Sequence, residues 1–259
     1  MVARNQSECI LSEPPTEWRH MTATATETET GMKLSQDTLA VLKNFASLNS
    51  NILIRPGNTI ATVTPVKNVM AEATVDETFD VEFGIWDLNK FLGVISLFKE
   101  PVLTFGEKSV VISDAARKNA PSVNYYYCEP SLLTSPKKSI TMPDILVSFK
   151  LTADNVSEIM RASSVLQVGD IAVRGTKDKI EVVVFDKADK GSNTYSIVVG
   201  ENKAKTKFDI HMKVDNLKLM AGDYDVHISK SIVAKFAHCS KDLTYFVALE
   251  ATSSTATKE

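Results

Sequence analysis

Two stretches far apart in the chain open in the same way. The first, KLSQDTLAVLKNFASLN, begins at Lys33, and the second, KLTADNVSEIMRASSVL, begins at Lys150. In each, a Ser or Thr suited to capping a helix is followed by an Asp in the first turn, where the helix dipole favours negative charge. Apolar residues then recur at helical spacing. The same helix start therefore occurs twice, which limits the fold to one built from a repeated unit.

A second pair of stretches supports the repeat and keeps the same order. FDVEFGIWDLNKF begins at Phe79, and FDIHMKVDNLKLM begins at Phe208. Two blocks that recur in the same order predict two copies of one domain. In each copy a long helix is followed by several short β-rich runs, then by a short helix near Asp87 or Asp215, and then by further strands. We therefore predict an α+β fold of two similar domains with two helices each.

The domain boundaries follow from changes in composition. Residues 1–31 contain the low-complexity stretch TATATETETG, which has nothing to bury, and a stretch with three prolines, CEPSLLTSPKKSITMP, separates the two copies. The prediction is a disordered N-terminal extension (1–31), a first domain (32–127), an interdomain linker (128–143), a second domain (144–251) and a disordered tail (252–259).

Composition excludes several classes of protein. The chain has 259 residues, of which 44% are hydrophobic, so it can bury a core, but no apolar run approaches the ~20 residues of a membrane span. The start of the chain lacks the basic and apolar regions of a secretion signal. The three cysteines are widely spaced, which favours free thiols in a reducing compartment. The net charge of −3 is carried by residues 1–31, so bulk charge does not indicate nucleic-acid binding.

The sequence also gives no sign of catalysis. Its four histidines are scattered, and no phosphate-binding loop, dinucleotide-binding motif or nucleophile elbow is present. His238 and Cys239 form a lone pair without the spacing of metal ligands. We therefore expect no enzyme activity, no metal site and no cofactor.

The outward faces of the predicted helices are small and polar and carry few acids. Each long helix has one basic residue on this face, Lys43 on the first and Arg161 on the second. The short helices carry Lys90 and Lys218. Such faces can lie close to a phosphate backbone. An ordinary solvated face remains the simpler interpretation of the residues alone.

Three stretches, taken in order along the chain, carry a resemblance to a known family. They are MKLSQDTLAVLKNFASLN from Met32, FDVEFGIWDLNKFLGVISLF from Phe79, and YFVALEA near the end. With the duplication and the linker, they resemble the DNA polymerase sliding clamps of T-even-type tailed phages over about residues 32–251. The resemblance implies two clamp-type domains per chain, with sheets outside and helices inside. It also implies that three subunits join head to tail in a closed ring, a homotrimer.

The resemblance also implies the function and the partners. The ring would encircle double-stranded DNA without sequence preference and tether the replicative DNA polymerase, which makes it a processivity factor. An ATP-driven clamp loader would open the ring, and other replication, repair or transcription factors would dock on it. As a phage-encoded protein, it would act in the cytoplasm of the host cell and would have no membrane partner.

Two sites follow from the same resemblance. The residues expected to face DNA lie on the four helices and are Lys43, Asn44, Lys90, Arg161 and Lys218. A pocket for an apolar peptide of the polymerase would include two linker leucines and part of the last strand, namely Leu132, Leu133, Tyr245, Phe246, Val247 and Leu249. The run LTYFVAL fits equally well an ordinary core strand with alternating faces. Residues 193–200 are one candidate for a strand that pairs between subunits.

A β-rich structural or oligomeric virion module without a DNA-encircling role is the alternative function. It would explain the duplication and the short strands. It would not explain acid-poor helix faces or an apolar pocket near the C-terminus. Stimulation of a replicative polymerase on a primed circle, but not on short linear DNA, separates the two functions.

Overall fold

The computed structural model describes residues 31–115, 120–142, 144–203, 205–230 and 233–255. The predicted N-terminal extension, apart from Gly31, lies outside the described residues, as does the end of the predicted tail. None of the helices within these ranges is long and apolar enough to cross a membrane.

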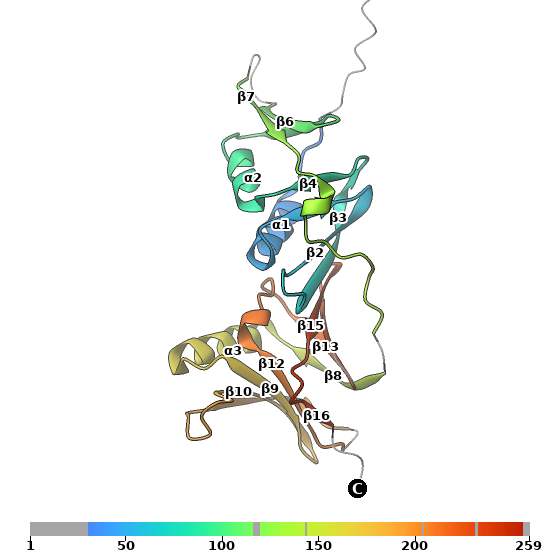
Figure 1. Cartoon of the computed structure of the whole chain (residues 1–259). Coiled ribbons are helices and arrows are strands. Elements are labelled where there is room, and N and C mark those ends of the chain that lie inside the picture. The colour runs from blue at the N-terminus through green and yellow to red at the C-terminus, as the bar shows by residue number, and fades with distance from the viewer. Residues whose placement is uncertain (1–30, 116–119, 143, 204, 231–232, 256–259) are drawn as a thin grey trace, which may run out of the picture. The chain divides into compact units, whose positions relative to one another are not determined.

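The first repeat begins with a long helix that is followed by strands, a short helix and more strands (Figure 1). Its elements are α1 (Gln36–Leu48), β1 (Ile52–Ile54), β2 (Gly57–Val63), β3 (Val69–Phe79), β4 (Phe83–Ile85), α2 (Leu88–Ile95), β5 (Pro101–Phe105), β6 (Ser109–Asp114) and β7 (Ser122–Tyr126). A single 3-10 turn, η2 (Pro130–Leu132), opens the linker.

The second repeat begins with a strand and then follows the same order. Its elements are β8 (Ile145–Leu151), α3 (Ala153–Leu166), β9 (Asp170–Gly175), β10 (Lys179–Phe185), β11 (Tyr195–Glu201), β12 (Phe208–Lys213), the 3-10 turn η3 (Val214–Asn216), β13 (Tyr224–Ser229), β14 (Val233–His238), β15 (Leu243–Ala248) and β16 (Ser254–Thr255). The predicted α+β class is confirmed, and so is the recurrence of a long helix followed by strands.

Four antiparallel sheets organise the strands. They have the orders β2-β3-β15-β14-β13-β8, β11-β10-β9-β12-β16, β5-β6-β7 and β1-β4. The six-stranded sheet draws strands from both repeats, because β3 pairs with β15, with Ala71 opposite Tyr245 and Val69 opposite Val247. The two repeats therefore share one continuous sheet, and one cluster of buried side chains extends through both.

The helix starts form as the sequence predicts. The Ser35 hydroxyl accepts a hydrogen bond from the Thr38 amide and caps α1. Thr152 caps α3, and Asn155 bonds back to the Thr152 amide to complete a capping box. Each such cap stabilises its helix by about 1 kcal/mol. Because both caps are local in sequence, they could be recognised without knowledge of the fold.

One apolar residue of α3 lies outside the buried face of the helix. The apolar spacing of this stretch predicts that Val165 is buried with Ile159, but the Val165 side chain is 75% exposed, whereas Ile159 is buried. At 100° per residue, Val165 lies about 120° around the helix from Ile159, outside a single packed face. Ser163 lies nearer to Ile159 on that face and is buried instead.

The expected fourth helix, from Asp215, is the main correction to the predicted fold. The structure has only the single turn η3 there, so within the described residues the second repeat contains one α-helix. Tyrosine side chains take the backbone groups that a helix would need. The Met220 amide donates to the Tyr245 hydroxyl (3.2 Å), and the Met220 carbonyl accepts from the Tyr224 hydroxyl (2.6 Å).

The C-terminal segment also differs from the expected tail, which was to be disordered from residue 252. The short strand β16 pairs with β12, and the Ser253 hydroxyl accepts a hydrogen bond from the His211 amide (3.0 Å). The Glu250 amide donates to the His211 carbonyl (2.8 Å). The polar sequence TSST suggested disorder. The edge of β12, however, offers backbone groups with which this segment forms hydrogen bonds.

Candidate DNA-facing surface and partner pocket

The four basic residues expected to face DNA are all exposed. Lys43 lies on α1, Lys90 on α2, Arg161 on α3 and Lys218 just after η3. Within the described ranges, no ion pair joins any of these four side chains to a carboxylate. Their charged groups are therefore not held in an ion pair within these ranges.

Acidic residues of the helices have partners elsewhere. Asp37, in the first turn of α1, pairs with Lys241 (2.8 Å). Glu158 of α3 accepts a hydrogen bond from the hydroxyl of Tyr195 on β11. The helix α2 contains no acidic residue. Asp37 is thus paired with a lysine of another segment. Glu158, however, lies one turn before Arg161 on α3, so its negative charge stays near that guanidinium.

Asn44 and Lys218 connect the two repeats. The Asn44 amide nitrogen donates to the Lys218 carbonyl (2.9 Å), and the Asn44 amide oxygen accepts from the Tyr245 hydroxyl (2.7 Å). The Lys218 ammonium in turn donates to the Ser47 carbonyl in the last turn of α1 (3.2 Å). A positive charge is favourable at this end of a helix. Both polar atoms of the Asn44 side chain are thus engaged inside the chain.

Burial keeps the tyrosine of this network protonated. Tyr245 has no exposed surface, and burial raises its pKa to about 12. Its hydroxyl therefore remains a hydrogen-bond donor to Asn44 at neutral pH. The network is a fixed polar link between α1, β15 and the segment that follows η3.

The residues expected to form a partner pocket separate into three locations. Tyr245 and Val247 are buried in the core shared by the repeats, and Leu249 packs against that core. Leu132, on η2, is 64% exposed, and Leu133 lies against the first repeat. A Cβ at Gly84 would lie 2.5 Å from the Leu133 side chain. The run LTYFVAL is therefore a strand with alternating faces. Tyr245, Val247 and Leu249 point to the shared core, and Phe246 points to the opposite face of the sheet.

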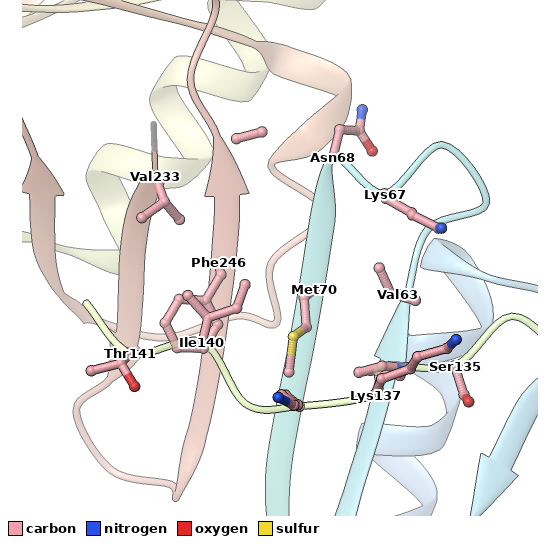
Figure 2. A pocket seen from close by; sticks show the side chains of 13 residues that line it. Val63, Lys67, Asn68, Met70, Ser135, Lys137, Ile140, Thr141, Val233 and Phe246 are labelled. Atoms are coloured by element: carbon pink, nitrogen blue, oxygen red, sulfur yellow. The ribbon is translucent and has the colours of Figure 1, made fainter. Parts of the chain in front are cut away.

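Phe246 lies in a cavity of about 640 Å³ on that face of the six-stranded sheet. Met70, Val233 and Phe246 form a small buried cluster that is separate from the main core. Figure 2 shows the linker from Ser135 to Thr141 running past Met70 and Phe246. The cavity is lined by Val63, Lys67, Asn68, Met70, Ser135, Pro136, Lys137, Lys138, Ile140, Thr141, Val233, Phe246 and Ala248.

The lining of this cavity combines an apolar floor with positive charge. Three lysines (Lys67, Lys137 and Lys138) line it, and none of its lining residues in the described part of the chain is Asp or Glu. The hairpin that carries Lys67 is anchored because the neighbouring Asn68 bonds to Asn216 of η3 (2.8 Å). The cavity can therefore accept an apolar side chain next to a negatively charged group.

Most of these residues could not be identified from the sequence, because the cavity is assembled from distant segments. Val63 and Met70 come from the first repeat, and Val233 comes from β14. The pairing of β3 with β15 brings Val63 and Met70 to Phe246, and the pairing of β14 with β15 brings Val233 there. The alternating pattern of LTYFVAL indicates one of them, because it places Phe246 on the face of the sheet opposite to Tyr245 and Val247.

The described residues contain no group of three or more His, Cys, Asp or Glu side chains that could hold a metal ion. Cys128 and Cys239 are free thiols, and Cys9 lies outside the described residues. The candidate site thus consists of two surfaces, one with exposed basic residues and one an apolar cavity with lysines at its rim.

Family models match both repeats. The model described as "gp45 sliding clamp, C terminal" matches residues 148–251. The model described as "DNA polymerase processivity factor" matches residues 34–105. The two matches divide the chain as the internal repeat does.

Two curated relatives extend the similarity over most of the chain. The sliding clamp of Vibrio phage KVP40 is 31% identical over 226 residues, which cover 85% of this chain and 100% of the relative. The sliding clamp of Enterobacteria phage T4 is 31% identical over 230 residues, which cover 86% of this chain and 98% of that protein.

Solved structures show the same fold at much lower identity. Proliferating cellular nuclear antigen from Thermococcus kodakaraensis superposes with a TM-score of 0.61 at 13% identity, covering 83% of this chain and 96% of that chain. The protein of the same name from Entamoeba histolytica gives a TM-score of 0.60 at 10% identity, covering 82% and 94%. At these identities the likeness shows the fold alone.

Proposed function

This chain belongs to the sliding-clamp family of DNA polymerase processivity factors, and from that premise we propose that three copies close into a ring around duplex DNA. The clamp tethers the polymerase. It keeps the polymerase on DNA because the ring surrounds the duplex, and it forms no covalent bond. A ring that cannot fall off needs only weak, sequence-independent contacts with the phosphate backbone, and such contacts permit sliding.

The junction between the repeats is the observation that supports a ring. The strands β3 and β11 correspond to each other, because each is the third strand after the long helix of its repeat. Likewise, β7 and β15 are each the last long strand of their repeat. Within the chain, β3 pairs with β15, whereas β11 and β7 are edge strands of their sheets. Pairing β11 of one copy with β7 of the next would repeat the existing junction, head to tail.

The surfaces of the two edge strands favour this pairing. Tyr126 on β7 and Val198 on β11 are 72% and 57% exposed. The inward residues of both strands are only half-buried, Tyr125 and Ile197 among them. Apolar edge strands invite pairing with another chain, and proteins usually cover or charge them. A neighbouring copy would cover β7 and β11 here. This agrees with the expectation that residues 193–200, which include most of β11, pair between subunits.

The basic residues on and beside the helices would make the contacts with DNA. Lys43, Lys90, Arg161 and Lys218 are exposed and have no carboxylate partner in the described residues. Lysine and arginine contacts with phosphates carry no sequence information. Asn44 would act through Lys218, because both of its amide atoms are bonded inside the chain.

The cavity at Phe246 would receive the replicative polymerase. An apolar side chain of a polymerase peptide would fill it, and the tether would raise the effective concentration of polymerase at DNA. An ATP-driven clamp loader, and other replication, repair or transcription factors, would compete for the same cavity. The protein would work in the cytoplasm of the phage's host cell and would itself catalyse no reaction.

Primer extension on two templates tests this proposal. With the phage clamp loader and ATP present, the full chain should increase the length of products made by the phage polymerase on a primed circle, and have little effect on short linear DNA, from which a ring slides off. Phe246→Asp should abolish the stimulation, and an unchanged native mass would show that the variant still folds and assembles. Equal stimulation on both templates would contradict a topological tether.

Native mass across a dilution series tests the ring itself. A trimer that dissociates reversibly on dilution is the expected result. A monomer at every concentration would overturn the closed ring and favour the alternative, a β-rich module without a DNA-encircling role.

A further inference from the structure

Two neighbouring rows of side chains cross the cavity-bearing face of the six-stranded sheet. Residues directly opposite on paired antiparallel strands lie about 4.5–5.5 Å apart at Cβ. The strand register places six residues in an anchor row: Val63, Met70, Phe246, Lys235, His227 and Ser148. The adjacent acid row contains Ala61, Glu72, Thr244, Ala237, Asp225 and Lys150.

Both rows lie on the face opposite the shared core. Along each strand, the residues between the row members are core residues, for example Tyr245 on β15, Phe236 on β14 and Val226 on β13. Because successive side chains of a strand point to opposite faces, the rows point away from that core. They form one continuous surface that begins at the cavity.

The anchor row changes from apolar to basic as it leaves the cavity. Val63, Met70 and Phe246 line the cavity, and Lys235 lies directly opposite Phe246 on the next strand. His227 is opposite Lys235 in turn, and its Nδ1 is hydrogen-bonded to the Ser148 hydroxyl (2.8 Å). No carboxylate belongs to this row, so the Lys235 ammonium places a positive charge next to the apolar cavity, with the His227 imidazole beyond it.

The acid row has the opposite character. It carries Glu72 and Asp225, and its one lysine, Lys150, is already paired with Asp223 (3.6 Å). A negatively charged ligand is therefore repelled from the acid row and attracted to the anchor row, where Lys137 and Lys138 of the linker add further positive charge at the cavity. The carboxylates on this face also disfavour a nucleic acid.

We propose that the anchor row binds a partner peptide whose apolar side chain fills the cavity and whose acidic flank lies over Lys235 and His227. This inference rests on the proposed function of the cavity as the polymerase pocket and adds the chemistry of the partner. The apolar anchor supplies affinity, and the charged flank supplies selectivity and rate of association, because rim charges act mainly in that way.

Synthetic peptides with one apolar anchor and different flanks test the proposal. The probes are fluorescein-labelled peptides with a Leu-Phe anchor and a Glu, Gln or Lys flank, each made with the flank before and after the anchor. Fluorescence anisotropy measures Kd on the full chain at low and high salt. The Glu-flanked peptide is expected to bind about five-fold more tightly than the Gln-flanked one at low salt, a preference that salt should reduce.

Charge reversal on the two rows supplies the matched variants. Lys235→Glu should abolish or reverse the preference for Glu, and Lys235→Gln should remove most of it. Lys150→Glu makes the same change of net charge on the acid row and should leave the preference within about twofold. Equal Kd values for Glu and Gln flanks would overturn the proposal, as would equal effects of Lys235→Glu and Lys150→Glu.

Phe246→Asp separates this inference from the function on which it rests. If Phe246→Asp abolishes binding of every peptide while the flank has no effect, only the acidic-flank inference fails. If Phe246→Asp leaves peptide binding unchanged, or if no peptide binds the full chain, the cavity is not the pocket and both proposals fail. Equal binding of a single-stranded oligonucleotide of matched charge would also overturn a peptide partner.

Discussion

The short helix α2 and the 3-10 turn η3 come from matching sequence blocks and fold differently. In the first repeat, the Asp87 side chain accepts a hydrogen bond from the Lys90 amide (2.9 Å) and caps a helix that buries Phe91. In the second repeat, η3 has no side-chain cap, and the Met220 backbone is bonded to two tyrosine hydroxyls. The local sequence thus permits a helix in both places, and contacts with other parts of the fold determine that only the first segment forms one.

The position of η3 explains why the second repeat has no second α-helix there. The segment after η3 lies where the repeats meet, and its Lys218 carbonyl accepts a hydrogen bond from Asn44 of α1 (2.9 Å). The α2 segment of the first repeat has the Tyr125 hydroxyl on the Asp87 carbonyl (3.1 Å), a contact within its own repeat. In the second repeat, the hydrogen bond from Asn44 to the Lys218 carbonyl links the two repeats where the first repeat has helix hydrogen bonds.

Truncating the corresponding side chains Phe91 and Met220 should give the largest contrast. Phe91 is buried and packs edge-to-face on Tyr125, with ring centroids 5.1 Å apart. Phe91→Ala should lower the free energy of unfolding by about 3–5 kcal/mol, because it leaves a cavity under the helix. Met220 is only half-buried, so Met220→Ala should cost about 1–2 kcal/mol. Urea denaturation measures both, and equal losses would show that the two segments are packed alike.

Alkaline pH should weaken the tyrosine contacts that replace the helix. Burial raises the pKa of Tyr245 to about 12, whereas an unfolded tyrosine ionises near 10. The unfolded state therefore loses its proton first, and the free energy of unfolding should fall as pH rises from about 10 to 12, by about 2–3 kcal/mol for this residue. Tyr245→Phe should fall less steeply over the same range in urea denaturation. Parallel pH profiles for the two proteins would contradict this role.

The hydroxyl groups of Tyr245 and Tyr125 provide a narrower test at neutral pH. Tyr245→Phe removes a donor to Asn44 and an acceptor for the Met220 amide, and should cost about 1–2 kcal/mol. Tyr125→Phe removes one hydrogen bond to a backbone carbonyl and should cost about 1 kcal/mol or less. Thermal unfolding at pH 7 measures both variants. A larger loss for Tyr125→Phe would mean that the link between repeats contributes little to stability.

The smallest expected effect concerns the two aspartates at the start of these segments. Asp87→Ala removes the α2 cap and should cost about 1 kcal/mol. Asp215→Ala removes no capping bond, because η3 has none, and should change the stability by less than about 0.5 kcal/mol. Differential scanning calorimetry compares the melting temperatures. Equal shifts would indicate that Asp215 caps a helix in solution after all.

Local features of the sequence predicted much of the fold. Ser35 and Thr152 cap their helices as expected, because a cap involves residues only a few positions apart. The apolar residues of α1 are buried as the helical spacing indicated, Phe45 among them. Val165 is apolar but exposed, because it lies about 120° around α3 from the buried Ile159.

Long-range features could not be predicted in the same way. The pairing of β3 with β15, and hence the cavity at Phe246, depends on strand register between the two repeats. Nothing in either strand alone specifies that register, because it depends on the packing of the whole sheet. The assignment of Lys43, Lys90, Arg161 and Lys218 to DNA remains a prediction, and their exposure is compatible with it.

The sheet shared by the repeats also has a consequence for synthesis of the chain. β3 leaves the ribosome early, but its partner β15 is nearly the last strand to be made. At about 5–20 residues per second, the nascent first repeat would expose the open edge of β3 for on the order of ten seconds or more. Slow translation, or a stall late in the message, would lengthen that exposure and leave an edge on which incomplete chains can aggregate. Yield of native protein should therefore depend on how quickly the final third of the chain is made.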